Sequence, residues 1–284
     1  TQEFQDYATI PNSPVDRATT KQLMANLTGD TGSFGLPAGP VAWAFGVEKR
    51  WEEYQNQPDG GAILGQIYSV AAEPTNGSYD VQEAYLEINA PLLSGITGVD
   101  RLDLSAAVRR SDYDFLDAQT TTKFGLEYVP TDGMLVRATF AEGFRAPGIG
   151  DLYSPQVESN ISYTDPCINY ANSNASETVK ANCAAEGLPG DFNLDNNQSS
   201  TLVGGNPDLK PETSESFTMG IVYQPEFIEN FSVAVDYYDI EIEDGLGAPS
   251  TSAIIAQCYN SENFSADSCN LIFCLLYTSD AADE

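Results

Sequence analysis

Histidine is absent from this chain of 284 residues, and basic residues are scarce. Twelve Lys and Arg stand against 42 Asp and Glu, which gives a formal net charge of −30 at pH 7. Without imidazole, the usual general base and the commonest zinc ligand are both missing, so the sequence argues against an enzyme. The negative charge repels phosphate backbones and therefore argues against nucleic acid as a partner.

Long apolar runs are also missing. No stretch of 18 or more apolar residues occurs, so the sequence predicts no transmembrane helix. The first residues, TQEFQDYATIPNSP, contain neither a basic leader nor an apolar core, and the first of them is not Met. We therefore predict no signal peptide and expect a piece of a longer protein. Pairs of carboxylates arise by chance among so many acidic residues, so we expect no catalytic site, no metal site and no cofactor.

Cysteine is sparse, and four of the five residues form two local pairs, Cys167 with Cys183 and Cys258 with Cys269. Both pairs lie in sequence rich in Asn, Ser and Asp. The spacing fits no CxxC metal site, and no histidine could complete one. We predict two loop disulfides, which implies an oxidising compartment. Four free thiols in a cytosolic loop are the alternative, which is disfavoured because free cysteine is normally buried.

What the sequence does contain is alternation of apolar and polar residues with a period of two, in seven segments. This pattern predicts strands with one apolar face, and no segment shows a helical period. Each run is about 10 to 13 residues long, which exceeds the usual strand of a soluble sheet and approaches a tilted membrane-spanning strand. Within these runs the alternation is clearest at 41–48, 83–88, 101–109, 123–128, 134–141, 216–223 and 231–237.

The connections between these segments alternate in length. Short ones fall near 92–99, 130–133 and 225–229, and long ones near 54–78, 144–212 and beyond 243, while the one near 113–118 is of moderate length and departs from the alternation. Antiparallel neighbours place alternate connections on the same rim, so one rim carries the tight turns and the other the large loops. We therefore predict an all-β fold: an antiparallel transmembrane β-barrel fragment of about seven long strands, with short periplasmic turns and long extracellular loops. A passive porin and a secreted β-sandwich binding module remain as alternatives.

The alternation also assigns the faces of the strands, since successive side chains point to opposite sides. The charged positions are expected to face a wet lumen and the apolar positions to face lipid. The lumen set is Lys123, Glu127, Arg137 and Asp236, and the lipid set is Phe124, Leu126, Tyr128, Phe217, Met219, Ile221, Val233 and Val235.

Two motifs interrupt the strand pattern: FAEGFRAPGIGDLYSP (140–155) and GGNPDLKPETSESFTMGIVYQP (204–225). The first resembles the Phe-Arg-Ala-Pro stretch at which a strand enters a large external loop in TonB-dependent outer-membrane receptors. The second resembles the Asn-Pro-x-Leu-x-Pro-Glu segment that leads those receptors into the next strand. YDVQEAYLEINAPLL and FSVAVDYYDIEIEDGL are similar to their repeated strand types, and the resemblance covers roughly 38–273.

The resemblance implies that the motif residues hold the loop base and do not touch cargo. Pro147 has no amide hydrogen and cannot extend the sheet, and we expect Arg145 to tie the loop base to acidic neighbours. The matching residues are Phe144, Arg145, Ala146 and Pro147 where the chain leaves the sheet, and Asn206, Pro207, Leu209, Pro211 and Glu212 where it returns.

The resemblance further implies a receptor and transporter of the bacterial outer membrane for active uptake of a scarce nutrient, such as an iron–siderophore complex or a glycan. Its partners would be membrane lipid, the nutrient and TonB. The family fold is a barrel of about 22 strands closed by a plug domain. We expect residues 1–273 to be part of that barrel, with the plug and the TonB box upstream.

Two further segments stand apart from the strand pattern. Asp191, Asn193 and Asp195 are spaced like the start of a calcium loop, but Asn196 and Leu202 replace the glycine and glutamate that such a loop requires, so we favour a solvated acidic loop. The last residues, CLLYTSDAADE (274–284), match a translated sequencing adapter letter for letter. We expect them to be a non-native tail, which would explain the fifth cysteine, Cys274.

Overall fold

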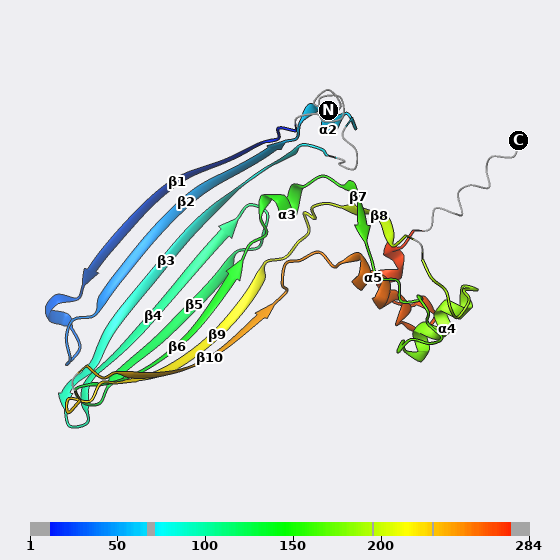
Figure 1. Ribbon diagram of the computed structural model, residues 1–284. Helices are drawn as coiled ribbons and strands as arrows, with labels where there is room; N and C mark the ends of the chain where they lie inside the picture. Colours follow the sequence, from blue (N-terminus) through cyan, green and yellow to red (C-terminus); the bar gives the residue numbers. More distant parts are fainter. Residues whose placement is uncertain (1–11, 67–71, 195, 229, 274–284) are drawn as a thin grey trace, which may run out of the picture.

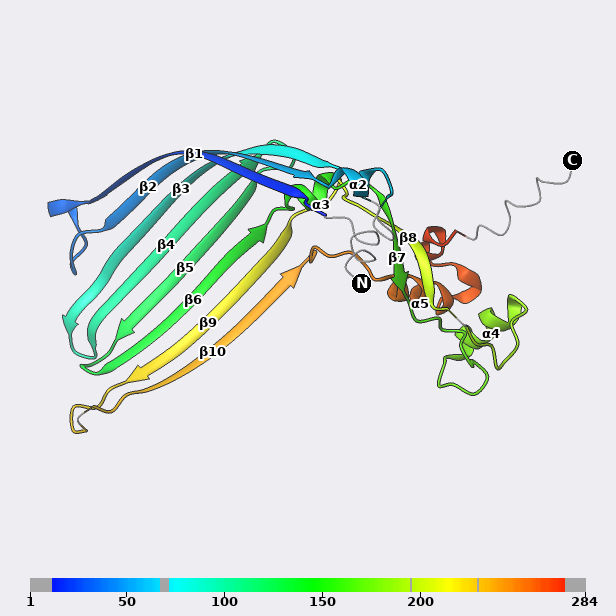
Figure 2. The ribbon, with the colours of Figure 1, turned by 45° about the horizontal axis from the view of Figure 1, so that its top comes forward.

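The computed structural model describes residues 12–66, 72–194, 196–228 and 230–273. Eight strands form one sheet in which every pair of neighbours is antiparallel, in the order β1-β2-β3-β4-β5-β6-β9-β10. Figures 1 and 2 show these strands side by side in one curved wall. The strands are β1 (Val15–Asp30), β2 (Ala42–Gln57), β3 (Thr75–Ile96), β4 (Val99–Tyr113), β5 (Gln119–Val129), β6 (Met134–Arg145), β9 (Glu212–Tyr223) and β10 (Val233–Glu243).

The predicted antiparallel sheet of long strands is confirmed, with one strand more than the seven expected. The additional strand is β1, whose sequence VDRATTKQLMANLTGD shows no sustained alternation. Its register nevertheless places Leu23, Ala25 and Leu27 on one face, while Arg17 and Lys21 occupy the same face nearer the other end. The charged end masked the strand pattern. The wall is open in the described residues, since β1 and β10 form its two edges.

The longest connections lie on one rim as predicted, but the sorting by length is incomplete, because 114–118 on that rim is shorter than 31–41 on the other. Between the described strands, one rim carries the turns 31–41, 97–98, 130–133 and 224–232. The opposite rim carries 58–74, 114–118, 146–211 and the segment after Glu243. Figure 1 shows the tight turns gathered at one end of the wall and the large loops extending from the other.

Short helices lie within the large loops, although no segment of the sequence shows a helical period. They are α2 (Gly60–Ile63), α3 (Ile149–Tyr153), α4 (Glu177–Ala185) and α5 (Thr251–Tyr259), with the 3₁₀ turns η1 (Gly32–Phe34), η2 (Glu262–Phe264) and η3 (Asp267–Leu271). Segments this brief contain too few turns to display a period. In the part of the chain that is described, no helix has both the length and the apolar character needed to cross a bilayer.

The loop 146–211 also contains a separate two-stranded sheet, β7 (Val157–Ser162) paired with β8 (Gln198–Val203). The buried hydrophobic cluster of the described chain lies beyond this hairpin and consists of Cys167, Tyr170, Val179 and Cys183.

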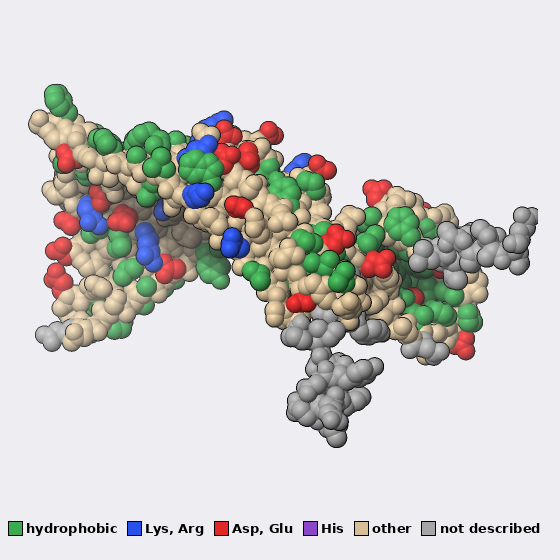
Figure 3. Space-filling model, turned by 90° about the horizontal axis from the view of Figure 1, so that it is seen from above, with side chains coloured by type: hydrophobic (Ala, Val, Ile, Leu, Met, Phe, Trp, Pro, Cys, Tyr) green, Lys and Arg blue, Asp and Glu red, His purple; other side chains and the backbone are tan. Residues whose placement is uncertain are grey.

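The register across the wall brings the apolar positions into common rows. Phe140 is opposite both Phe124 and Phe217, and Ala138 is opposite both Leu126 and Met219. Their outer surfaces are open: Phe124 is 51% exposed and Leu126 is 40% exposed. Figure 3 shows Lys, Arg, Asp and Glu side chains in the hollow of the curved sheet. The polar side chains therefore share one face and the apolar side chains the other, and contact of the apolar face with lipid remains a prediction.

Candidate functional site

The two sequence motifs meet at the base of loop 146–211. Arg145, the last residue of β6, lies opposite Glu212, the first residue of β9. Its Nη2 is 3.0 Å from Oε2 of Glu212 and its Nε is 3.4 Å from Oε1, so the guanidinium grips both carboxylate oxygens. The same carboxylate accepts a hydrogen bond from the backbone N–H of Leu246 at 3.1 Å. Glu212 thus joins both ends of one loop to the start of the next.

The segment after Arg145 turns in over the wall. The Pro147 side chain is buried, and α3 packs against β3 at Gly77. A Cβ at position 77 would lie 2.5 Å from both Ile149 Cγ2 and Tyr153 Cδ2, so only glycine permits this approach. Figure 1 shows α3 at the large-loop end of the sheet.

The returning motif is fastened to α3. The backbone N–H of Asn206 donates to Asp151 O and that of Gly205 donates to Ser154 O, both at 2.8 Å. The Asn206 side chain accepts from the backbone N–H of Asp208 at 2.9 Å, which shapes the local turn. The two motifs, far apart in sequence, therefore form one layer beneath the loop.

The remaining motif residues are not part of the Arg145–Glu212 ion pair. The ring of Phe144 meets Tyr113 edge-on with centroids 6.1 Å apart. Leu209 donates its N–H to Asn206 O at 3.4 Å. Ala146 and Pro211 are half-buried, and Pro207 is exposed.

Sequence reasoning missed a charged cluster on the polar face near the same rim. Arg50 lies 2.6 Å from Glu48, 2.7 Å from Glu52 and 3.8 Å from Glu83. The hydroxyl of Ser111, which is fully buried, donates to Glu83. The alternation of β2 and β3 places these residues on the polar face, but it could not show that they converge. Beside them, Tyr79, Tyr113 and Phe115 form an aromatic group with centroids 5.3 to 5.8 Å apart.

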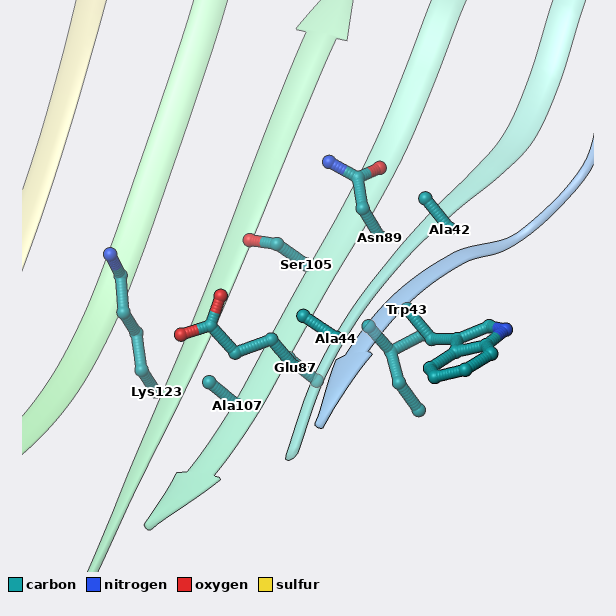
Figure 4. A pocket seen from close by; sticks show the side chains of 10 residues that line it. Ala42, Trp43, Ala44, Glu87, Asn89, Ser105, Ala107 and Lys123 are labelled. Carbon is teal, nitrogen blue, oxygen red and sulfur yellow. The ribbon is translucent and has the colours of Figure 1, made fainter. Parts of the chain in front are cut away.

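Lower on the wall, the polar face has a hollow of about 320 Å³. Figure 4 shows Lys123, Glu87, Asn89 and Ser105 around this hollow, while Trp43 points away from it. Its floor is formed by small side chains, which leave the space open: Ala42, Ala44 and Ala107. A wall of this kind can contact a polar solute or a second protein layer.

One ion pair crosses a whole strand. Arg137 in β6 reaches Asp236 in β10 at 2.8 Å, passing over Gly220 in β9. A Cβ on Gly220 would lie 2.1 Å from Oδ1 of Asp236, so the glycine is what allows the contact. Lys123, Glu127, Arg137 and Asp236, which the sequence assigns to one face, do share the polar face of the wall.

The large loops carry the two disulfides, which join Cys167 to Cys183 and Cys258 to Cys269. Tyr259 of α5 packs against the buried cluster of the other loop. Its hydroxyl donates to Glu186. Burial, followed by this hydrogen bond to a carboxylate, raises the pKa of Tyr259 above its ordinary value.

Within the described ranges, no group of three or more His, Cys, Asp or Glu residues is arranged to hold a metal ion. Asp195, part of the segment spaced like a calcium loop, lies outside those ranges. Residues 274–284 do as well, so the expected adapter-derived tail stays a prediction.

This architecture defines a class: the wall of a wide antiparallel barrel with its structured loops on one rim. The sequence profile described as "TonB dependent receptor-like, beta-barrel" matches residues 1–270. The chain therefore belongs to this family of TonB-dependent receptors. No curated protein is significantly similar to it in sequence.

Solved structures agree on the fold. The siderophore receptor PirA from Acinetobacter baumannii superposes with a TM-score of 0.53 at 16% identity, over 81% of this chain and 28% of that one. PirA from Pseudomonas aeruginosa gives a TM-score of 0.50 at 13% identity, over 80% and 32%. A variant of the ferric enterobactin receptor PfeA from Pseudomonas aeruginosa gives 0.51 at 16% identity, over 79% and 27%. The chain thus spans about a third or less of the length of these receptors.

Proposed function

We propose that this chain is part of the barrel wall of a bacterial outer-membrane receptor that takes up a scarce nutrient with energy supplied through TonB. The observation that carries the proposal is the placement of all the large, structured loops on one rim, above a concave polar wall. In a membrane, the apolar face would contact lipid and the polar face would line the passage.

An iron–siderophore complex is the first candidate cargo, since two of the structural relatives are siderophore receptors. A glycan is the second candidate. The loop 146–211 holds eight acidic residues and two basic residues, which disfavours small anions. Family membership also favours transport over catalysis.

A passive porin is the alternative that shares the wall. Two features favour a receptor. The loop base is clamped by Arg145 and Glu212 and packed against β3 through α3. The loops also contain a buried core and disulfides. A porin needs neither for diffusion of small solutes.

The test is growth under iron limitation of a strain that lacks the gene for the full-length receptor. We expect one class of ferric siderophore to stop supporting growth, and re-expression to restore it. Deleting TonB in the complemented strain should abolish uptake again. Uptake that persists without TonB would support the porin, and normal growth of the gene deletion on every siderophore would turn attention to glycans.

A further inference from the structure

The two large loops differ in how each is joined to the wall. Loop A is residues 146–211 and loop B is residues 244–273. Loop A is held at its base by the Arg145–Glu212 ion pair and by α3, which packs on β3. Loop B begins with a segment without regular secondary structure, residues 244–249, which we term the tether.

The tether has little to hold it. A Cβ added to Gly245 or Gly247 would meet nothing within 4 Å, and most of its residues are exposed. Among the described residues, the tether makes one hydrogen bond to the sheet, from Leu246 N–H to Glu212. Few contacts and exposed backbone are the features of segments that open at low cost. The end of β10 therefore does little to fix the position of loop B.

Loop B is instead held by loop A. The side chain of Asn182, in α4 of loop A, is 5% exposed, and its amide nitrogen donates to two backbone carbonyls of loop B. The acceptors are Tyr259 O at 2.9 Å and Ser261 O at 2.8 Å. Both N–H donors of one buried amide are thus used across the boundary between the loops. Removal of this amide would leave the two carbonyls without it as a partner.

Further contacts surround this amide. The hydroxyl of Ser176 donates to the Asn260 side chain at 3.0 Å, and Thr164 N–H donates to Ser252 Oγ at 2.9 Å. Tyr259 covers the buried cluster around the Cys167–Cys183 disulfide. Figures 1 and 2 both show α5 lying toward loop A and well beyond the end of β10.

We propose that loop A positions loop B, so that the two loops move as one body above the rim. The two hydrogen bonds of the Asn182 amide, which we term the latch, hold the loops together, and the tether restrains loop B only weakly. Each loop is cross-linked internally by its own disulfide, so each half of this body keeps its own shape while the latch holds them together. The arrangement couples two loops on the same rim, so that a displacement of loop A carries loop B with it.

The test is hydrogen–deuterium exchange on the full-length receptor in detergent, which needs no cargo and is therefore independent of the proposed function. Asn182→Ala should accelerate exchange in residues 251–264 by about tenfold, the effect of losing a buried pair of hydrogen bonds. Exchange in β9 and β10 should not change. Asn174→Ala is the matched control, since Asn174 lies in loop A and is exposed. Unchanged protection of residues 251–264 in Asn182→Ala would overturn the proposal.

A second variant leaves the latch intact and alters the tether. Insertion of two glycines after Gly247 should leave the protection of residues 251–264 within about twofold of the unmodified receptor, because local opening is set by the contacts with loop A. Loss of that protection would show that β10 positions loop B, and would overturn the proposal. Should Asn182→Ala also loosen loop A itself, a disulfide between Ser176→Cys and Asn260→Cys in that variant must restore protection to residues 251–264; failure to do so would also overturn it.

Discussion

The wall and the loop body, which is the name we give to loops A and B together, are stabilised by different means. In the wall, large apolar side chains such as Val235 (70% exposed) and Ile221 (41% exposed) face outward, and the strands are held by continuous backbone ladders. In the loop body, Val179 is 3% exposed and packs against two fully buried cysteines. The wall has its apolar surface outside and the loop body has it inside. This contrast is what we expect if the apolar face of the wall contacts lipid and the loop body is surrounded by water.

The largest loss of stability is expected from a charged side chain on the apolar face of the wall. Leu126→Arg should destabilise the membrane-inserted receptor by about 2–4 kcal/mol, because the guanidinium would enter hydrocarbon. Glu127→Arg, on the polar face one residue away, should cost far less. Urea titration of the receptor in lipid vesicles gives the free energies of unfolding. A harmless Leu126→Arg beside a severe Glu127→Arg would invert the assignment of the two faces.

Removal of a loop disulfide should destabilise the loop body and leave the wall unchanged. Replacing Cys167 and Cys183 with Ser opens a loop whose closure contributes roughly 3 kcal/mol in the chain-entropy model. We expect limited proteolysis to cut residues 160–195 many times faster, while the heat-resistant migration of the barrel on gels stays unchanged. A loss of barrel migration would show that the wall depends on the loop body, against the separation described above.

Contact between the regions is tested at Gly77, where α3 meets β3. Gly77→Ala places a Cβ 2.5 Å from Ile149 Cγ2, and overpacking of this kind costs about 1–3 kcal/mol. Gly60→Ala is the control, because a Cβ there meets nothing within 4 Å. Hydrogen exchange of residues 146–154 should rise in the first variant and stay constant in the second. Equal exchange rates in the two variants would show that the packing of α3 on β3 does not determine the protection of residues 146–154.

The two regions also differ in what could be predicted from sequence. The wall follows a two-residue period that each strand displays by itself, so seven strands and the sorting of loops by rim were predicted. Strand β1 escaped because Arg17 and Lys21 share the face of Leu23 and Leu27. Local cysteine spacing likewise matched the disulfides that the structure contains.

The contacts that define the site do not repeat along the chain and could not be found from a period. Glu212 meets Leu246, and Asn182 meets Tyr259, through the folding of separate loops. The Arg137–Asp236 pair depends on the absence of a side chain at Gly220, which no local pattern announces. Short loop helices such as α3 were missed for the related reason that a helix of five residues has no visible period.

The smallest expected effect concerns alkaline pH and is confined to the loop body. The pKa of Tyr259 is raised above its unfolded value of about 10, mainly by burial and then by the hydrogen bond to Glu186. A raised pKa means that the unfolded loop loses this proton first, so the stabilisation is fully present below about pH 10 and disappears as the pH rises through the folded pKa. Tyr259→Phe should remove that pH dependence and cost about 0.5–1.5 kcal/mol at neutral pH, the value of one hydrogen bond. Exchange of α5 amides, corrected for intrinsic rates and followed between pH 8 and 11, measures both effects. A variant with the same alkaline profile as the unmodified receptor would show that another group governs the opening of the loops at high pH.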